Sequence, residues 1–468
     1  MIKKLLTKNF LVRISCCLLF AAFLILPSAA VGQTKKQSKQ AAKLSEEGDR
    51  SLRQKDYKTA ISKYAEAIAL LPSLAQAHFG KSAAHIELKE NDQAIAELDA
   101  ALAGGYKPLE IYRARWSLYF TGKNYDAALR DAEKGLEIDP KNAAFYRAIG
   151  EIQLAKNSYQ AALDNFQKFA QANPNDADIY YFIASAYGGL KDTEKQISAA
   201  EEAVKRNTRY TGESYFLIAE ARRENKDYTR AAEFYRKAIG AKPDVDIAAY
   251  RNLADVYRRQ NLFREAIEII QNGLQKFPDD GNLYADSGRY LNLADRNAEA
   301  IIAAEKAVRL LPESFAAHAG LCRIYYETKQ YQFAQKACDA ALKINGGDGV
   351  ANVYSGFINL SLGREEIAKG FFKRAVDRMS EFTKANPDYF DGFYLLGNSF
   401  YYAEQPQKAV EAYLNTLELN PKFTRARFNL GLAYFVGGNL PAAREQYTAL
   451  LKTDKDLAEK LKAVIEKK

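Results

Sequence analysis

A helical hairpin that recurs about every 34 residues limits what this chain can fold into more than any other feature of its sequence. Over residues 143–176, apolar side chains follow helical spacing in two runs, which are separated by a turn at Lys156–Ser158 and closed by Pro174. Gly150 in the first run and Ala162 in the second are small, so two antiparallel helices can approach closely. Helices this short cannot bury their apolar faces alone, and the hairpin therefore predicts a stack of similar hairpins.

The pattern returns along nearly the whole chain, with about twelve copies over residues 41–457. A closing proline occurs in phase at Pro72, Pro140, Pro174, Pro243, Pro278, Pro312 and Pro421. The length of the unit, its aromatic positions, its small pair and its closing proline resemble the tetratricopeptide repeat (TPR) family. The resemblance implies an all-α fold, a right-handed superhelical solenoid of helix-turn-helix repeats in which the first helices line a concave face.

The repeats are expected to be least regular over residues 345–389. The run Asn345–Gly349 replaces the usual proline, and about seven extra residues around Ser380–Asn386 add roughly two helical turns. Beyond the last repeat, residues 456–468 carry apolar side chains at helical spacing among lysines. That pattern predicts a helix that caps the solenoid with its apolar face and leaves the other face in water.

The first 32 residues differ in kind from the repeats. Four basic residues precede an apolar run at Ile14–Leu26, and small residues follow at Ser28–Gly32. This order is typical of a secretory signal peptide, and the run is short for a membrane span. We expect cleavage after Gly32 and no membrane span thereafter, with an uncleaved anchor as the alternative. Residues 33–40 are polar and should form a flexible leader to the first repeat.

Cys322 and Cys338 are the cysteines that remain beyond the signal peptide. They take the eighth and twenty-fourth positions of one repeat, which face the same seam between two helices. An exported protein folds in an oxidising compartment, so a disulfide between them is one interpretation. The alternative is a pair of small buried side chains that fill the seam.

The sequence offers no set of residues suited to catalysis. Its three histidines occupy positions of the repeat, and it contains no zinc-protease motif, no Cys/His metal spacing and no nucleophile elbow. We therefore expect no enzyme, no cofactor and no metal site. Removal of the signal peptide lowers the net charge by four, from +9 to +5, and basic residues alternate with acidic ones along the helices. Nucleic acid is therefore not an expected partner.

The concave positions of the repeats are not needed for packing, and their character changes along the chain. They are basic in the seventh to ninth repeats and mostly aromatic in the last three. Following the resemblance, the candidate peptide-binding groove consists of Arg251, Arg258, Arg259, Arg289, Arg323, Tyr326, Tyr394, Asn398, Tyr401 and Phe428. Arginine pairs with carboxylates, and tyrosine provides contact area at low entropic cost. The expected ligand is an extended segment with acidic and apolar side chains.

These observations predict an exported scaffold that mediates protein–protein interactions through its groove in a bacterial cell envelope, either periplasmic or secreted. A chaperone-like holder of exported chains and a module that binds envelope polysaccharide are the alternatives. Sugars stack on exposed aromatic faces, and the one tryptophan, Trp116, takes a packing position and is expected to be buried. The expected partner is therefore a protein or peptide, and the sequence leaves the oligomeric state open.

The signal peptide gives a testable prediction. The mature chain should begin at or near Gln33 and lie outside the cytoplasm, because Ala30 and Gly32 meet the requirement for small residues before the cleaved bond. Ala30→Glu should leave the signal peptide attached. N-terminal sequencing of both proteins checks this, and recovery of Met1 on a soluble cytoplasmic wild-type protein would contradict it.

Overall fold

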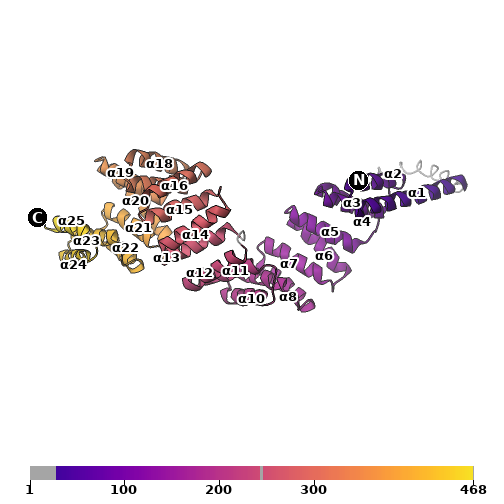
Figure 1. The fold of residues 1–468 in the computed structure, drawn as a ribbon, viewed down its shortest axis with the longest axis horizontal. Coiled ribbons are helices and arrows are strands. Elements are labelled where there is room, and N and C mark those ends of the chain that lie inside the picture. Colours follow the sequence, from indigo (N-terminus) through magenta and orange to yellow (C-terminus); the bar gives the residue numbers. More distant parts are fainter. Residues whose placement is uncertain (1–27, 243–245, 467–468) are drawn as a thin grey trace, which may run out of the picture. The chain divides into compact units, whose positions relative to one another are not determined.

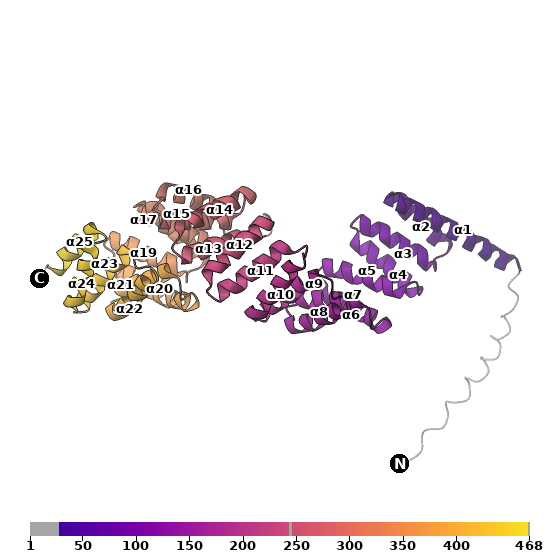
Figure 2. The same ribbon diagram turned by 60° about the horizontal axis from the view of Figure 1, so that its bottom comes forward.

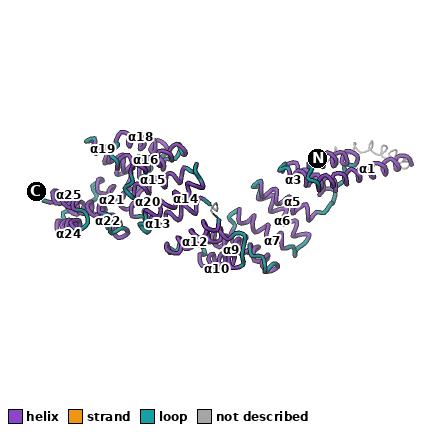
Figure 3. The backbone as a smooth tube through the Cα atoms, viewed as in Figure 1, coloured by secondary structure: helices purple, strands orange, loops and turns teal. Residues whose placement is uncertain are grey.

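A computed structural model describes residues 28–242 and 246–466 of the chain. Most of the expected signal peptide lies outside these residues. The described residues form 25 helices in consecutive pairs and no strand (Figures 1 and 3). This confirms the predicted all-α repeat fold. The structure divides into two compact units, one ending at Asn175 and the other beginning at Asp176, where the sequence suggested a single array.

The first unit holds four hairpins. Its helices are α1 (Ser28–Arg53), α2 (Tyr57–Leu70), α3 (Ala75–Glu87), α4 (Asn91–Ala103), α5 (Pro108–Thr121), α6 (Tyr125–Ile138), α7 (Ala143–Ala155) and α8 (Tyr159–Ala172). Residues 33–40 differ from the expected leader, because they continue α1 as helix, with residues 34–40 exposed. Ala41 is the first buried residue described in this helix.

The second unit continues the same arrangement (Figure 2). Its first ten helices are α9 (Asp178–Gly189), α10 (Thr193–Lys205), α11 (Thr211–Glu224), α12 (Tyr228–Ala241), α13 (Ile247–Arg259), α14 (Phe263–Lys276), α15 (Gly281–Leu293), α16 (Asn297–Leu310), α17 (Phe315–Glu327) and α18 (Tyr331–Ile344). The remaining helices are α19 (Gly349–Ser361), α20 (Glu365–Ala385), α21 (Phe390–Tyr402), α22 (Pro406–Leu419), α23 (Thr424–Val436), α24 (Leu440–Leu451) and α25 (Lys455–Ile465).

A left-handed residue turns the chain inside each hairpin. These residues are Lys55, Lys89, Lys123, Asn157, Lys191, Lys226, Asn261, Asp295, Lys329, Gly363, Glu404 and Gly438. Their spacing follows the repeat, and they mark twelve hairpins among the described residues, in agreement with the count made from the sequence. The residue after the turn often caps the second helix, as Asp56 does by accepting a hydrogen bond from the Thr59 N–H.

In several hairpins the two helices meet where an aromatic ring lies on a glycine. A Cβ atom built on Gly150 would lie 2.4 Å from the Phe166 ring, and one on Gly397 would lie 2.5 Å from Tyr413. The sequence paired Gly150 with Ala162, which is buried, but the glycine itself is covered by the ring four residues further on. Substitution of these glycines would push the helices apart.

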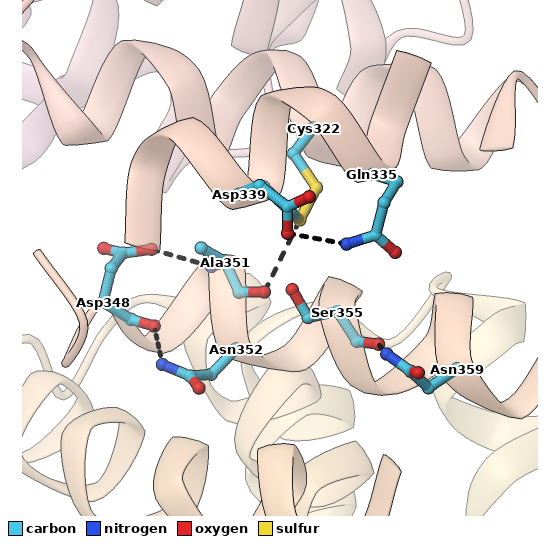
Figure 4. Close-up of a disulfide and its surroundings, with 9 residues drawn as sticks. Cys322, Gln335, Asp339, Asp348, Ala351, Asn352, Ser355 and Asn359 are labelled. Atoms are coloured by element: carbon cyan, nitrogen blue, oxygen red, sulfur yellow. Dashed lines mark hydrogen bonds between the residues drawn. A yellow bond between two sulfur atoms is a disulfide. The ribbon is translucent and has the colours of Figure 1, made fainter. Parts of the chain in front are cut away.

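The tenth hairpin carries the predicted extra length. Helix α20 has 21 residues, against 14 in α16 and α18, so the added residues lengthen the second helix by about two turns. Asp348 begins the hairpin by accepting a hydrogen bond from the Ala351 N–H (Figure 4). The irregularity expected over residues 345–389 is therefore a longer helix and a capped turn.

Cys322 of α17 and Cys338 of α18 form a disulfide, with their Cα atoms 5.1 Å apart. Both side chains are buried in the seam between the two helices. Figure 4 shows the bridge beside α19, where the Cys338 Sγ lies 3.5 Å from the Ala351 carbonyl oxygen. The bridge joins the two helices of one hairpin and touches the next.

Helix α25 covers the end of the second unit. Its Leu461 is buried and lies against Gly431 of α23, in a small core with Leu450 and Ile465. This is the arrangement that the terminal apolar spacing predicted.

Loss of this contact should destabilise only the end of the array, because each repeat packs on its neighbours. Leu461→Ala should weaken the last hairpin by about 2–4 kcal/mol. Hydrogen exchange should speed up in α23–α25 and stay unchanged in α13. Lys460→Ala, at an exposed neighbour, is the matched control. Uniform loss of protection along the chain would contradict nearest-neighbour stacking.

Candidate functional site

The arginines predicted for the groove lie on the first helices of three consecutive hairpins, α13, α15 and α17. On α13, Asp255 forms ion pairs with two arginines. The Arg258 Nη2 lies 2.8 Å from the Asp255 Oδ1, and the Arg259 Nε lies 2.7 Å from the Asp255 Oδ2. Burial alone would raise the pKa of Asp255, but the two guanidinium groups outweigh it and hold the pKa below its usual value. One carboxylate thus serves two cations.

The junction between α20 and α21 occupies the surface in front of these cations. Asp388 pairs with Arg259 and accepts a hydrogen bond from the Tyr228 hydroxyl group. The Tyr389 ring lies 3.8 Å from the Arg258 guanidinium carbon, and Arg258 is fully buried beneath it. Arg258 and Arg259 are therefore not open to a ligand in this structure, contrary to the expectation of a free groove.

Arg323 of α17 is also paired within the chain. Its Nη1 and Nη2 lie 2.5 Å and 3.1 Å from the two oxygens of Asp391, at the start of α21, and its Nε donates to Glu327 at 3.1 Å. This bidentate pair is nearly buried. It fastens α21 to α17 and does not present a free cation.

Arg251 and Arg289 are the two predicted cations that still face open space. Their side chains are 39% and 40% exposed, and both bind Asp286, which is 5% exposed. The Arg251 Nε donates to Asp286 at 2.7 Å, and the Arg289 Nη1 donates to the Tyr389 hydroxyl oxygen at 3.3 Å. A carboxylate buried between two half-exposed guanidinium groups leaves net positive charge at this point.

These two arginines line a cavity of about 670 Å³. Its walls come from α15 and α17, the start of α19, the end of α20 and the start of α21. The volume lies within the range of about 300–1,000 Å³ that is usual for ligand sites. Phe315 and Phe382, each 38% exposed, are large apolar side chains on its lining, with Leu311 and Met379 nearby. The cavity thus combines cationic donors with an apolar wall.

The aromatic half of the predicted groove is mainly packing. Tyr326 stacks on Phe357 with ring centroids 5.5 Å apart, and Tyr394 meets Phe423 edge-on at 4.9 Å. Burial raises the pKa of Tyr326, Tyr394 and Tyr401. Phe428 packs on the core beneath α25. These rings pack on other side chains of the array and are half-buried.

Asn398 is buried as well. Its Oδ1 accepts hydrogen bonds from the Tyr413 hydroxyl group and from Asn429 Nδ2, both at 2.8 Å. The Asn398 amide oxygen of α21 thus accepts hydrogen bonds from residues on α22 and α23, and these bonds connect the three helices. It is not placed to bind a peptide.

The sequence reasoning missed the acidic partners and the cavity. Asp388 lies 129 residues beyond Arg259, and Asp391 lies 68 residues beyond Arg323. A pattern that repeats about every 34 residues gives no sign of these two contacts. The extra length of the tenth repeat was the available signal. The extra length indicates a longer second helix, whose following loop can reach hairpins that are not adjacent to it. From the sequence alone, this length was interpreted only as irregularity.

The other polar residues singled out from the sequence have structural partners. His78 contacts Glu97 at 2.5 Å, His85 contacts Glu90 at 2.6 Å, and His318 contacts the Pro312 carbonyl oxygen at 2.9 Å. Within the described ranges, no group of three or more His, Cys, Asp or Glu side chains could hold a metal ion. No described helix has the length and apolar character needed to cross a membrane.

The first unit has a smaller hollow of about 340 Å³, lined by Phe79 of α3 and Arg113 and Leu118 of α5. Trp116, also on α5, is half-buried with its ring centroid 6.2 Å from that of Phe120. It therefore packs within its own hairpin, although less completely than the sequence suggested.

Comparison with known proteins identifies the class of this chain. Models of the tetratricopeptide repeat match residues 46–107, 116–177, 183–246 and 394–458, and a second tetratricopeptide model matches residues 222–286. These matches cover more than half of the chain. The chain belongs to the tetratricopeptide repeat family, and its repeats form the kind of scaffold that mediates protein–protein interactions.

Individual relatives resemble parts of the chain. A TPR repeat-containing protein of Methanocaldococcus jannaschii is 24% identical over 49% of this chain and 40% of its own length. Small glutamine-rich tetratricopeptide repeat-containing protein 2 of Saccharomyces cerevisiae is 41% identical over 14% of this chain and 18% of its own length. The chain thus spans less than half of either relative. The APC/C Cut9–Hcn1 structure is 11% identical and covers 94% of this chain and 99% of its own, with a TM-score of 0.47.

The shared carboxylate on α13 should make stability depend on pH. The pKa of Asp255 is lowered by folding, so its contribution is complete above the unfolded pKa and is lost as the pH falls through the folded pKa. Asp255→Asn should cost about 3 kcal/mol at pH 7, because it leaves the buried Arg258 without its charge partner. The difference should shrink below about pH 4.

Urea unfolding followed by circular dichroism at pH 7 and pH 3 measures this dependence. Glu233→Gln, an exposed carboxylate paired with Lys237 on α12, is the control and should leave the unfolding midpoint unchanged. An equal loss of stability for Asp255→Asn at both pH values would show that packing, not charge, is the main contribution of Asp255.

Proposed function

We propose that this chain is an exported TPR scaffold that binds a protein partner through the cavity of its second unit. The partner would offer a segment in which an acidic side chain lies next to a large apolar one. The proposal places the protein in a bacterial cell envelope, either periplasmic or secreted. The order of charged, apolar and small residues over positions 1–32 supports export.

One observation carries the proposal for the site. Arg251 and Arg289 share the single buried carboxylate of Asp286 and face the same cavity as the exposed rings of Phe315 and Phe382. A second carboxylate would balance the charge of the two arginines, and charge-assisted hydrogen bonds of this type are the strong ones. An apolar side chain beside it would cover the rings. A segment with both chemistries matches the cavity better than a sugar, which would need an open ring face.

Catalysis is not part of the proposal. The titratable groups around the cavity are paired arginines and carboxylates that hold helices together, as Asp391 does with Arg323. A nucleophile positioned beside a base would be expected in a hydrolase or transferase. The residues that line this cavity support recognition by charge and shape.

The proposal is tested by affinity purification from the protein's own envelope fraction. The full mature chain serves as bait, beside the double variant Arg251→Gln/Arg289→Gln. The variant should recover at least tenfold less of the specific partner, because each arginine contributes a charged hydrogen bond worth about 1.5–3 kcal/mol. Titration of the recovered partner at low and high salt should show a weaker salt dependence for the variant.

Arg309→Gln, at an exposed arginine near the end of α16, is the matched control because it changes the net charge without changing the cavity. It should bind like the wild type. Equal recovery of the partner by the folded double variant would move the site away from the cavity. If neither the wild-type chain nor the double variant recovers a specific partner, the proposed function is wrong.

A further inference from the structure

The segment at Asn386–Tyr389, between α20 and α21, lies on helices that precede it by more than a hundred residues. Asp388 binds Arg259 of α13 and the hydroxyl group of Tyr228, the first residue of α12. Tyr389 covers Arg258 of α13 with its ring. The Tyr389 hydroxyl group also accepts a hydrogen bond from Arg289 of α15. A loop between adjacent hairpins thus contacts hairpins two, three and four places earlier.

The length of α20 makes this reach possible. Its 21 residues place the loop about two turns beyond the point at which a 14-residue second helix such as α16 ends. Pro387 at the tip is exposed, whereas Tyr389 is buried. Phe390 and Asp391 already belong to α21, where Asp391 is fixed by Arg323. Tyr389 is the N-cap residue of α21, and its carbonyl oxygen accepts hydrogen bonds from the Gly392 and Phe393 N–H groups. The parts that could leave the surface of α13 without disturbing α21 are therefore the side chains of Asp388 and Tyr389.

The surface beneath the loop has the same charge arrangement as the cavity. Without Asp388 and Tyr389, Arg258 and Arg259 would share only Asp255, as Arg251 and Arg289 share Asp286. The Arg258 Nη1 atom is buried and has no hydrogen-bond partner among the described residues, and the Tyr389 ring lies over the guanidinium group. Such a surface attracts a carboxylate that is followed by an aromatic ring.

We propose that Asp388 and Tyr389 are an internal ligand of a second recognition site on α12 and α13, and that a partner segment with an acidic residue followed by an aromatic residue displaces them. This inference rests on the proposed function, because it gives the same protein partner a second contact on the concave side. The internal pair lowers the apparent affinity for that segment by the fraction of molecules in which the site is free. Removal of the pair should therefore tighten binding.

The probe is a fluorescein-labelled octapeptide with the sequence of residues 386–393, NPDYFDGF, and the matched peptide NPNAFDGF lacks the acidic and aromatic pair. The protein is the full chain carrying Asp388→Asn/Tyr389→Ala, which empties the site. This variant should bind the first peptide at least tenfold more tightly than the wild type does, and more tightly than it binds the second peptide. Adding Arg259→Gln should abolish the gain.

Glu381→Gln is the control for a charge change on α20 away from the site, since Glu381 is exposed and pairs with Arg378. It should bind the octapeptide as the wild type does. Equal affinity of the wild type and the folded double variant for NPDYFDGF would overturn the inference. So would a double variant that binds both peptides equally well, because the acidic and aromatic pair would then not be what the site recognises.

A measurement on the wild-type chain covers the case in which the double variant does not fold. With NPDYFDGF at millimolar concentration, hydrogen exchange should accelerate at residues 386–389 and slow at the start of α12 and the end of α13. No change in exchange at these residues would overturn the inference. NPNAFDGF at the same concentration should leave exchange unchanged.

The two proposals fail separately. Tight binding of NPDYFDGF to the double variant, with no partner recovered from the envelope fraction, would support the second site and leave the proposed function without support. A recovered partner that depends on Arg251 and Arg289, together with no binding of NPDYFDGF, would support the cavity alone and make the loop a permanent brace of the fold.

Discussion

The close contact between a large side chain and a small one inside the hairpins is the constraint on which the rest of this structure depends. A Cβ on Gly48, Gly356 or Gly397 would lie within 3 Å of the ring sixteen residues later, so these hairpins can close only when the position under the ring is nearly empty. In the hairpin of α5 and α6 the large and small positions are exchanged between the two helices. Trp116 packs on a core that includes the small Ala132. Close packing of this kind sets the angle between helices, and hence the direction in which the concave side chains point.

The greater length of one helix, α20, determines which of the arginines on the first helices pair with the residues that follow it. The longer α20 brings Asp388 and Asp391 to arginines on α13 and α17, and several of the charges expected to recruit a partner are satisfied within the chain. Burial of Arg258 would be costly without this contact, because a desolvated guanidinium group needs a carboxylate or an aromatic face beside it. The basic residues are therefore partly structural, and the half-exposed cations are Arg251 and Arg289, which pair with neither Asp388 nor Asp391.

The fold could be predicted from the sequence because its information is local and repeated. The twelve turns, the extra length near residue 380 and the terminal cap at Leu461 all follow from patterns within one or two repeats. The site could be predicted only in part. Periodicity placed Arg251 and Arg289 on the concave side, but it could not show that Arg323 has a partner 68 residues later. Tyr394 and Asn398 were assigned to the groove because the same positions serve packing and binding, and the pattern does not distinguish the two roles.

The proposed binding by the remaining half-exposed cations would need no domain beyond the repeats. An arginine has five N–H donors, and among the described contacts of Arg251 only its Nε–H has an acceptor, Asp286. Asp286 is held between two first helices, so the donors of Arg251 and Arg289 keep their positions before any ligand arrives. A site organised in this way loses little conformational entropy on binding, which is the main cost that a flexible surface would pay. Stacking of two neighbouring repeats thus positions Arg251 and Arg289 around Asp286 when the protein folds, and the longer α20 contributes the side chains of Met379 and Phe382 to the cavity wall.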